Sequence, residues 1–291
     1  MGIYSLWVFF GLDGFRPDHR FFVIGATIFY FLNRTSRKLI LGFGFLILMW
    51  VLFDSLRLFP NYEYNTLHIG DLYLLEKDLF GVQTIDKVIT ANEFFDIHNN
   101  TFFDIYTAII YICYIPVPIA FGIYLFFSKR RITMVHFFFT FLLVCLTGWT
   151  FQYIYPAAAP WYVEMYGIDS AFQKVPGNPG RLINFDKYFG VNIFSMQYSL
   201  NANVYAAVPS LHCAYPIIQL FFAVKNKLKW WALFYIIFMI STWFSAVYTN
   251  HHYIIDVLCG IVTALLAITL YSLLLKTKFK SFLDNYGKRL S

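Results

Sequence analysis

The chain has 291 residues, of which 59% are hydrophobic, 22% aromatic and only 13% charged. A soluble protein carries about 25% charged residues, so this composition argues against a soluble enzyme. The 35 Phe, 22 Tyr and 7 Trp residues also exclude an intrinsically disordered chain. The composition therefore predicts a multi-pass membrane protein whose partner is the lipid bilayer.

The net charge of +6 does not indicate a nucleic-acid partner, because the basic residues fall in short clusters between apolar runs. The four cysteines include no CxxC pair, which argues against a disulfide framework and against a zinc site. Residues 1–19 show no basic region followed by a small-residue cleavage site, so we expect no removed signal peptide.

Apolar segments long enough for membrane helices recur along the chain. A helix needs about 20 apolar residues to cross a hydrocarbon core of about 30 Å. We therefore predict an all-α transmembrane bundle with six spans and a seventh, shorter candidate at its N-terminal end. The apolar segments, with the short candidate first, are 20–32, 38–56, 103–127, 132–155, 207–224, 230–248 and 253–275.

The connections between these segments differ sharply in charge. Fourteen of the 22 basic residues, with Asp284 as the one acid, fall at alternate connections and in the C-terminal tail. Cytoplasmic loops carry the Lys/Arg excess, so we place these connections in the cytoplasm. The long segments 57–102 and 156–206 then lie on the non-cytoplasmic face.

Three regions follow from this pattern. Residues 1–101 form N-terminal membrane helices with an extracytoplasmic or interfacial segment, 102–275 a transmembrane core, and 276–291 a basic cytoplasmic tail. The stretch 71–80 (DLYLLEKDLF) is open to two interpretations, an amphipathic helix lying flat on the outer leaflet or part of a folded cap.

Three polar motifs fall on the same non-cytoplasmic face. VPSLH (208–212) begins one apolar segment, SAVYTNHHYIID (245–256) joins the next two, and YPAAAPWY (155–162) follows the end of a fourth. Ionisable residues near the ends of membrane helices are costly and need a reason. An active site assembled from helix ends is one such reason.

In the second motif, His252 and Asp256 are four residues apart on a predicted helix, so their side chains share a face. The carboxylate would accept from one imidazole nitrogen and leave the lone pair of the other nitrogen facing outward. That arrangement suits a nucleophile or a base. A His–Asp pair that only satisfies itself inside a bundle is the structural alternative.

The first motif places Ser210 as the cap of a helix, with His212 in the first turn. A helix N-terminus favours a phosphate group, and His212 could donate a proton to a leaving oxygen. Capping serines and first-turn histidines are common, so this motif indicates an active site only in combination with the motif at 245–256.

Together the motifs resemble the second and third signatures of the type 2 phosphatidic acid phosphatase superfamily, PSxH and SRxxxxxHxxxD. The Arg of the third signature is replaced by Ala246, and the first signature, KxxxxxxRP, is absent. These departures, together with YPAAAPWY, PGNPGRLINFDKYFG and the segment DSLRLFPNYEYNTLHIGDLYLLEKDLFG, resemble the inositol phosphorylceramide synthase branch. The resemblance covers most of residues 50–265.

The resemblance implies transfer of a phosphate group through phosphohistidine. His252 would attack the phosphorus, Asp256 would orient His252, and His212 would protonate the leaving alkoxide and then deprotonate the incoming hydroxyl. The reaction implies no cofactor and no metal.

Further residues are candidates for binding the substrate. Phosphoryl oxygens need cationic or N–H donors, and Lys174, Arg181 and Lys187 lie in the outer loop. Arg181 is the preferred candidate, because it follows a Pro/Gly-rich turn that could return it to the site. A solvated loop charge is the equal alternative for Arg181 and the favoured one for Lys174 and Lys187. Ser210, His251 and Tyr248 are the other candidates. His19, His68, His98 and His136 are expected to be structural or interfacial.

The implied function moves phosphoinositol from phosphatidylinositol to ceramide. The first alternative is a lipid phosphatase with water as acceptor, and the second is a transporter or membrane scaffold. We place the active site on the non-cytoplasmic face of a bacterial inner membrane, or of a Golgi-type membrane in a eukaryote. The oligomeric state is left open.

Overall fold

The computed structural model describes residues 17–170, 175–201 and 203–291, with side chains from residue 21 onward. Helices make up most of this part of the chain. The α-helices are α2 (Pro17–Leu32), α3 (Arg34–Gly42), α4 (Gly44–Ser55), α5 (Gly70–Phe80), α6 (Ala91–Ile97), α7 (Thr101–Ile112), α8 (Pro116–Phe127), α9 (Arg131–Ile154), α10 (Pro160–Tyr166), α11 (Ile183–Phe189), α12 (Ile193–Ser199), α13 (Leu211–Lys225), α14 (Lys229–Tyr248), α15 (Ile254–Leu274) and α16 (Phe279–Arg289). The short 3-10 helices are η1 (Leu56–Leu58), η2 (Asn61–Glu63) and η3 (Gly180–Leu182).

The all-α prediction misses one small element, a hairpin formed by β1 (Val82–Gln83) and β2 (Val88–Ile89). The two strands pair antiparallel, with Val82 opposite Ile89. Thr84 closes the turn, because its backbone N–H donates to the Lys87 carbonyl at 2.9 Å and its hydroxyl accepts from the Lys87 N–H at 3.2 Å. A local side-chain bond of this kind favours a turn over a continued helix.

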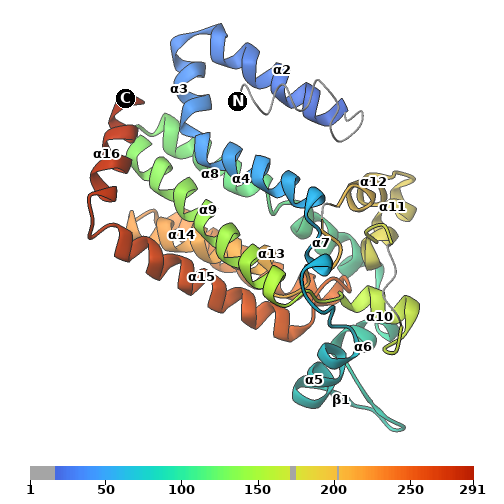
Figure 1. Ribbon diagram of the computed structural model, residues 1–291. Helices are drawn as coiled ribbons and strands as arrows, with labels where there is room; N and C mark the ends of the chain where they lie inside the picture. Colours follow the sequence, from blue (N-terminus) through green and yellow to red (C-terminus); the bar gives the residue numbers. More distant parts are fainter. Residues whose placement is uncertain (1–16, 171–174, 202) are drawn as a thin grey trace.

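The bundle is built around α9, which contacts α4, α8, α13, α15 and α16 (Figure 1). Most of its side chains are buried, as expected for a helix that is apolar on all sides. By contrast, α14 and α15 present large apolar side chains outward, among them Ile237, Ile240, Val262 and Leu265. Large exposed apolar surfaces of this kind are unfavourable in water and favourable against the hydrocarbon of a membrane.

The structure lowers the predicted number of full-length spans. Among the described residues α9, α14 and α15 are long and apolar enough to cross a membrane. Two bent pairs, α3 with α4 and its 3-10 extension (53°) and α7 with α8 (48°), raise the number to as many as five. The 15-residue α13 begins at Leu211 and not at residue 207, because Pro209 and the capping Ser210 precede it. At 1.5 Å per residue it reaches about 22 Å, less than the bilayer core of about 30 Å.

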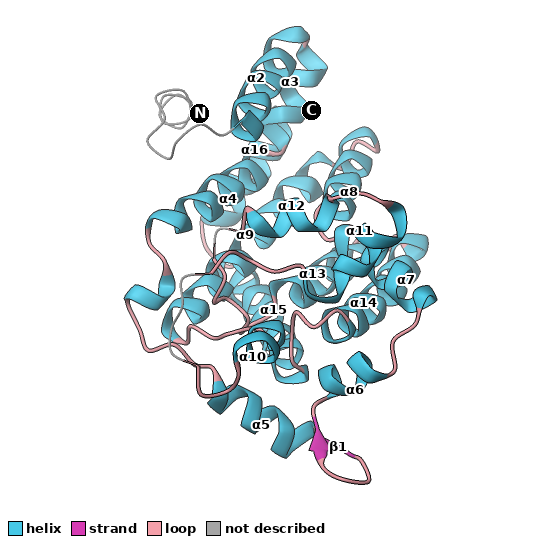
Figure 2. Cartoon of the chain, turned by 90° about the vertical axis from the view of Figure 1, so that its right-hand side faces the viewer, coloured by secondary structure: helices cyan, strands magenta, loops and turns pink. Residues whose placement is uncertain are grey.

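The described residues of the long segments 57–102 and 156–206 fold into a cap at one end of the bundle (Figure 1 and Figure 2). Three distant stretches meet there as short parallel bridges, His68 with Ala157 and Ala157 with Ala206. Helix α5 joins this cap by burying Leu72 and Glu76, while Leu74, Leu75 and Leu79 point outward. The stretch 71–80 thus belongs to the folded cap and also presents an apolar side.

At the opposite end, α16 folds back onto α9. Leu283 and Leu290 are buried there. His136 of α9 contacts Asp284 of α16 at 2.9 Å and Tyr271 of α15 at 2.9 Å. The basic segment 276–291 is therefore packed against the bundle in large part.

Gly260 allows α15 to approach the start of α13. A Cβ atom at this position would lie 2.4 Å from the Ser210 carbonyl oxygen, which is backbone and cannot rotate away. The close approach joins the two helices that carry the polar motifs predicted from the sequence. We therefore expect the position to be intolerant of any side chain.

Gly260→Ala should lower stability by about 1–3 kcal/mol, the range observed when a packed core is overfilled. The measurement is the midpoint of thermal unfolding in detergent. Gly25→Ala is the matched control, because a Cβ there meets no atom within 4 Å. Equal midpoints for Gly260→Ala and the wild-type protein would contradict this account of the contact.

Candidate active site

The loop between α14 and α15 carries two adjacent buried histidines, His251 and His252. Asn250 adopts a left-handed conformation (φ 66°) just after α14, as Asn tolerates at helix ends. The N–H groups of both histidines then donate back to the Ala246 carbonyl, at 3.3 and 3.0 Å. This turn places the two rings at the capped end of the bundle.

His252 is held through its Nδ1 atom. Nδ1 lies 3.1 Å from the Ala207 carbonyl oxygen and 3.3 Å from Oδ2 of Asp256. Both atoms are acceptors, so Nδ1 carries the hydrogen and the Nε2 lone pair is left for chemistry. The sequence predicted Asp256 as the partner, but it gave no sign of the closer backbone carbonyl.

Burial keeps the ring of His252 neutral. The side chain lies in a desolvated environment that lowers its pKa from 6.5 to about 4, although the Ala207 carbonyl works in the opposite direction. A neutral imidazole with a free nitrogen is the nucleophilic form. His252 therefore has the protonation state that attack on phosphorus requires.

The start of α13 lies directly beside this loop. Ser210 is fully buried, its hydroxyl accepts from the Cys213 N–H at 3.4 Å, and its own N–H donates to the Asp256 carbonyl at 3.0 Å. His212 follows in the first turn. Its ring centroid lies 5.7 Å from that of His252, with an interplanar angle of 54°. Two histidines that are forty residues apart in the sequence thus face one small volume.

Aromatic rings surround the histidines. Tyr111 of α7 has its hydroxyl 3.2 Å from Nδ1 of His212, and the ring of Tyr114 meets His212 edge-on at 4.5 Å. His251 is stacked between Tyr111 at 5.3 Å and Tyr198 at 4.4 Å. Tyr111, Tyr114 and Tyr198 were not predicted as site residues, because nothing in the sequence distinguishes them from the other tyrosines among the 22 in the chain.

His251 itself makes a structural contact. Its Nε2 lies 2.9 Å from the Pro179 carbonyl, and its burial lowers the pKa well below 6.5, so Nε2–H of a neutral ring donates to that oxygen. The bond fixes the Pro/Gly-rich turn over the loop. Gly180 completes the turn with a φ of +51°, and a Cβ there would lie 2.5 Å from the Thr249 carbonyl. This conformation and this contact both require glycine.

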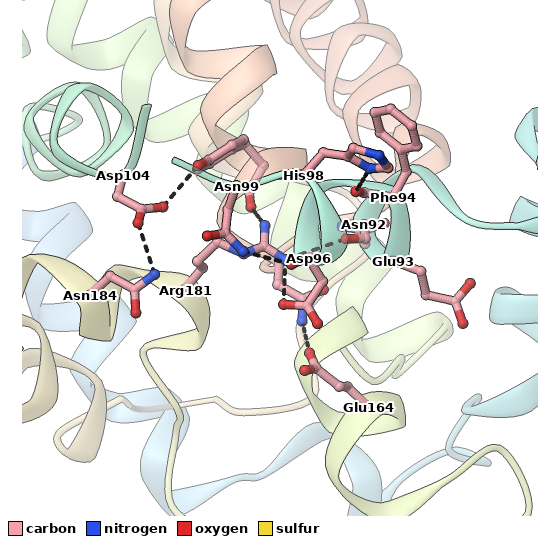
Figure 3. A network of polar contacts seen from close by, with 12 residues as sticks. Asn92, Glu93, Phe94, Asp96, His98, Asn99, Asp104, Glu164, Arg181 and Asn184 are labelled. Atoms are coloured by element: carbon pink, nitrogen blue, oxygen red, sulfur yellow. Dashed lines mark hydrogen bonds and ion pairs between the residues drawn. The ribbon is translucent and has the colours of Figure 1, made fainter. Parts of the chain in front are cut away.

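The turn brings Arg181 against α6 and the end of α14, where its side chain is buried. Figure 3 shows it in a polar network with Asn92 and Asp96. Its guanidinium donates to the Tyr248 carbonyl, to the Asn92 carbonyl at 3.4 Å, and to Asp96 at 3.1 Å. These contacts join the turn to α6 and to the end of α14. Within the described residues, Nε of Arg181 is buried without a hydrogen-bond partner.

Tyr248 belongs to the same network as Arg181. Its hydroxyl donates to the buried carboxylate of Asp104 at 2.8 Å, and its ring lies under Arg181 at 5.3 Å. Asp104 also accepts from Asn184 at 3.0 Å (Figure 3). This network connects α7, α11 and α14 beside the site.

Three buried polar side chains form hydrogen bonds with backbone groups of the site, and none of the three was predicted from the sequence. Glu76 of α5 accepts from the N–H groups of Ile254 and Ile255 at 2.9 and 3.1 Å, capping α15. Asn92 donates to the carbonyls of Val247 at 2.9 Å and His252 at 3.0 Å. Gln152 does the same for Ala206 and Pro209, at 3.2 Å each. The detectable signal for Glu76 is its position four residues after Leu72, which places the carboxylate on the same face of the helix as that apolar residue.

Of the other two basic candidates, Lys187 is exposed on α11, and Lys174 falls outside the described residues. His68 pairs with Asp71, His98 contacts the Phe94 carbonyl at 2.9 Å, and the side chain of His19 is not among those described. Within the described part of the chain, His, Cys, Asp and Glu form no cluster of three or more that could hold a metal ion.

Comparisons with known proteins agree with these motifs. A family model described as the PAP2 superfamily matches residues 84–270. The chain is 41% identical over 277 residues to the phosphoinositol dihydroceramide synthase of Bacteroides thetaiotaomicron, which covers 94% of this chain and 90% of that protein. No solved structure matches the chain.

Fungal proteins are more distant relatives. The chain is 29% identical over 243 residues to the inositol phosphorylceramide synthase catalytic subunit of Saccharomyces cerevisiae, covering 82% of this chain and 56% of that protein. It is 31% identical over 139 residues to the inositol phosphorylceramide synthase of Candida albicans, covering 46% and 27%. The resemblance predicted from the sequence is confirmed. The chain belongs to the PAP2 superfamily.

Proposed function

We propose that this protein is a membrane phosphotransferase that moves phosphoinositol from phosphatidylinositol to the hydroxyl of a ceramide-type lipid. The observation that carries the proposal is the histidine pair: the rings of His212 and His252 lie 5.7 Å apart, and His252 is oriented through Nδ1. The relative that is 41% identical along 94% of the chain supports the choice of substrates.

In the first half-reaction, Nε2 of His252 attacks the phosphorus of phosphatidylinositol. As the N–P bond forms, the bond from phosphorus to the glycerol oxygen breaks, and that oxygen takes a proton from His212. Diacylglycerol leaves, and phosphoinositol stays on His252. Asp256 and the Ala207 carbonyl stabilise the positive charge that develops on the ring of His252, because both accept from Nδ1–H.

In the second half-reaction, the acceptor hydroxyl gives its proton to His212 and attacks the same phosphorus. The N–P bond breaks, and His252 returns to its neutral form. His212 thus loses a proton in the first half-reaction and regains one in the second, so no net proton is consumed. Imidazole is suited to both directions near neutral pH.

The phosphoryl oxygens need donors in both half-reactions. Ser210 caps α13, so the N–H groups of Leu211 and His212 belong to a first helical turn, where no carbonyl of the helix itself can accept from them. We propose these two groups as donors. Arg181, through its unpartnered Nε, and Lys174 complete the proposed phosphate and headgroup contacts, with His251 and Tyr248 shaping the pocket.

We further propose that the site faces the non-cytoplasmic side of the membrane. Helix α16 lies at the end of the bundle away from α5, α6 and α10 (Figure 1), and Arg131 donates to the Leu290 carbonyl beside it. Cytoplasmic segments carry the Lys/Arg excess. The proposed division into residues 1–101, 102–275 and 276–291 is kept, with residues 102–270 of the core inside the family match.

Transfer is distinguished from hydrolysis by a labelled-substrate experiment. Purified protein is incubated with phosphatidylinositol labelled in its headgroup, with and without ceramide. We expect the label in a ceramide product, and little free inositol phosphate when ceramide is absent. Release of inositol phosphate at the same rate with or without ceramide would identify a phosphatase.

Substitutions at the His252 dyad should have graded effects. His252→Ala removes the nucleophile and should abolish transfer. Asp256→Asn should reduce the rate by about 10- to 100-fold, less than the roughly 10⁴-fold loss seen where a carboxylate is the principal partner of the histidine, because the Ala207 carbonyl still holds Nδ1–H. Asp78→Asn, at an exposed position on α5, is the control. An Asp256→Asn enzyme as inactive as His252→Ala would show that the carbonyl does not orient the ring.

The first half-reaction should resist acid. Because the pKa of His252 is lowered to about 4, the neutral nucleophile persists as the pH falls from 7 to 5. A single-turnover measurement of diacylglycerol release should therefore show no loss of rate over this range. A decline centred near pH 6.5 would indicate an ordinary, solvated histidine as the nucleophile.

A further inference from the structure

His212 must act twice through the same ring nitrogen. It gives a proton to one oxygen and later takes a proton from another, and both oxygens are bonded to the same phosphorus. The ring therefore needs a fixed orientation in its protonated and its neutral form. His252 has Asp256 and the Ala207 carbonyl for this purpose, but neither atom contacts His212.

The hydroxyl of Tyr111 is the group that contacts the other side of His212. It lies 3.2 Å from Nδ1, and the two ring centroids are 4.7 Å apart. The tyrosine side chain is 2% exposed. Tyr111 is near the C-terminal end of α7, just before the bend of 48° that separates α7 from α8. The bend therefore places the phenol at the histidine pair.

We propose that Tyr111 is a positioning residue that fixes the ring and tautomer of His212, an inference that rests on the proposed phosphotransfer. The phenol oxygen accepts from Nδ1–H, so Nε2 is the nitrogen that faces the phosphate. Nδ1 carries its hydrogen whether or not Nε2 is protonated. The same hydrogen bond therefore holds in both half-reactions, and the ring does not need to turn over between them.

Tyr111 is itself firmly held. Its ring stacks on His251 at 5.3 Å with an interplanar angle of 14°, and His251 is bonded to the Pro179 carbonyl. Earlier on the same helix, the hydroxyl of Tyr106 contacts Ser241 of α14 at 2.6 Å. These contacts fix α7 against both histidine motifs, as a positioning residue requires.

The chemical nature of the partner suits the role. A carboxylate beside an imidazole strongly favours the imidazolium form, because opposite charges attract. A neutral phenol carries no such charge, so Tyr111 orients the ring of His212 without an ion pair that would hold its proton. The structure thus pairs the nucleophile with a carboxyl group, Asp256, and the proton carrier with a phenol, Tyr111.

The test compares two donors that differ in their need for an acid. Diacylglycerol leaves as an alkoxide and needs a proton from His212, whereas p-nitrophenolate is stable and leaves without one. To isolate the first half-reaction, single-turnover release of the leaving group is measured without ceramide, from phosphatidylinositol and from the p-nitrophenyl ester of inositol phosphate. We expect Tyr111→Phe to slow release of diacylglycerol by about 10- to 100-fold, which is part of the 10²–10⁴-fold that acid–base catalysis contributes. Release of p-nitrophenol should slow less than threefold, which corresponds to a change of less than about 0.7 kcal/mol in the activation free energy.

The control is Tyr106→Phe, which also removes one hydroxyl hydrogen bond from α7 but lies away from His212. It should leave the ratio of the two rates at the wild-type value. Each ratio is measured on one preparation, so partial unfolding lowers both rates alike and does not change it. A wild-type ratio for Tyr111→Phe, whether both rates fall or neither does, would overturn the proposal. Failure of the wild-type protein to transfer phosphoinositol at all would instead refute the proposed function.

Discussion

The site depends on one buried hydrogen bond, from Nδ1 of His252 to the Ala207 carbonyl, shared with the carboxylate of Asp256. A buried N–H and a buried carbonyl each carry a penalty unless they are paired. Their pairing joins the end of the outer loop to the start of α15 and leaves Nε2 of the ring free. The nearby contacts maintain this arrangement: Ser210 bonds to the Asp256 carbonyl, and Gly260 allows the two helices to approach.

Side chains from distant segments complete the polar requirements of these helix ends. Glu76 satisfies two N–H groups at the start of α15, and burial raises its pKa although both donors act against that rise. Asn92 and Gln152 satisfy carbonyls on either side of the histidine pair. A helix end buried without such partners would be unstable. The cap therefore covers the site and also supplies hydrogen-bond partners for the backbone N–H and carbonyl groups of the site.

The parts of this architecture that depend on local pattern could be predicted from the sequence. Apolar segments showed where helices form, and the spacing of His252 and Asp256 showed that they share a face. The Ala207 carbonyl could not be foreseen, because a backbone atom leaves no mark in a sequence. Tyr111 and Glu76 were missed because their contacts cross about 100 and 180 residues of chain. The number of full-length spans was overestimated because hydropathy does not reveal the breaks after Gly42 and Ile112.

The parallel bridges that join His68, Ala157 and Ala206 have a consequence for biogenesis. The chain emerges from the ribosome in order, and pairing of remote segments incurs an entropic cost before any contact offsets it. The early membrane helices can be inserted before Ala206, the last residue of these bridges and the neighbour of Ala207, has been synthesised. The nucleophile His252 follows Ala207 by another 45 residues. The catalytic centre is therefore completed late in synthesis, and a chain that stops before His252 lacks its nucleophile.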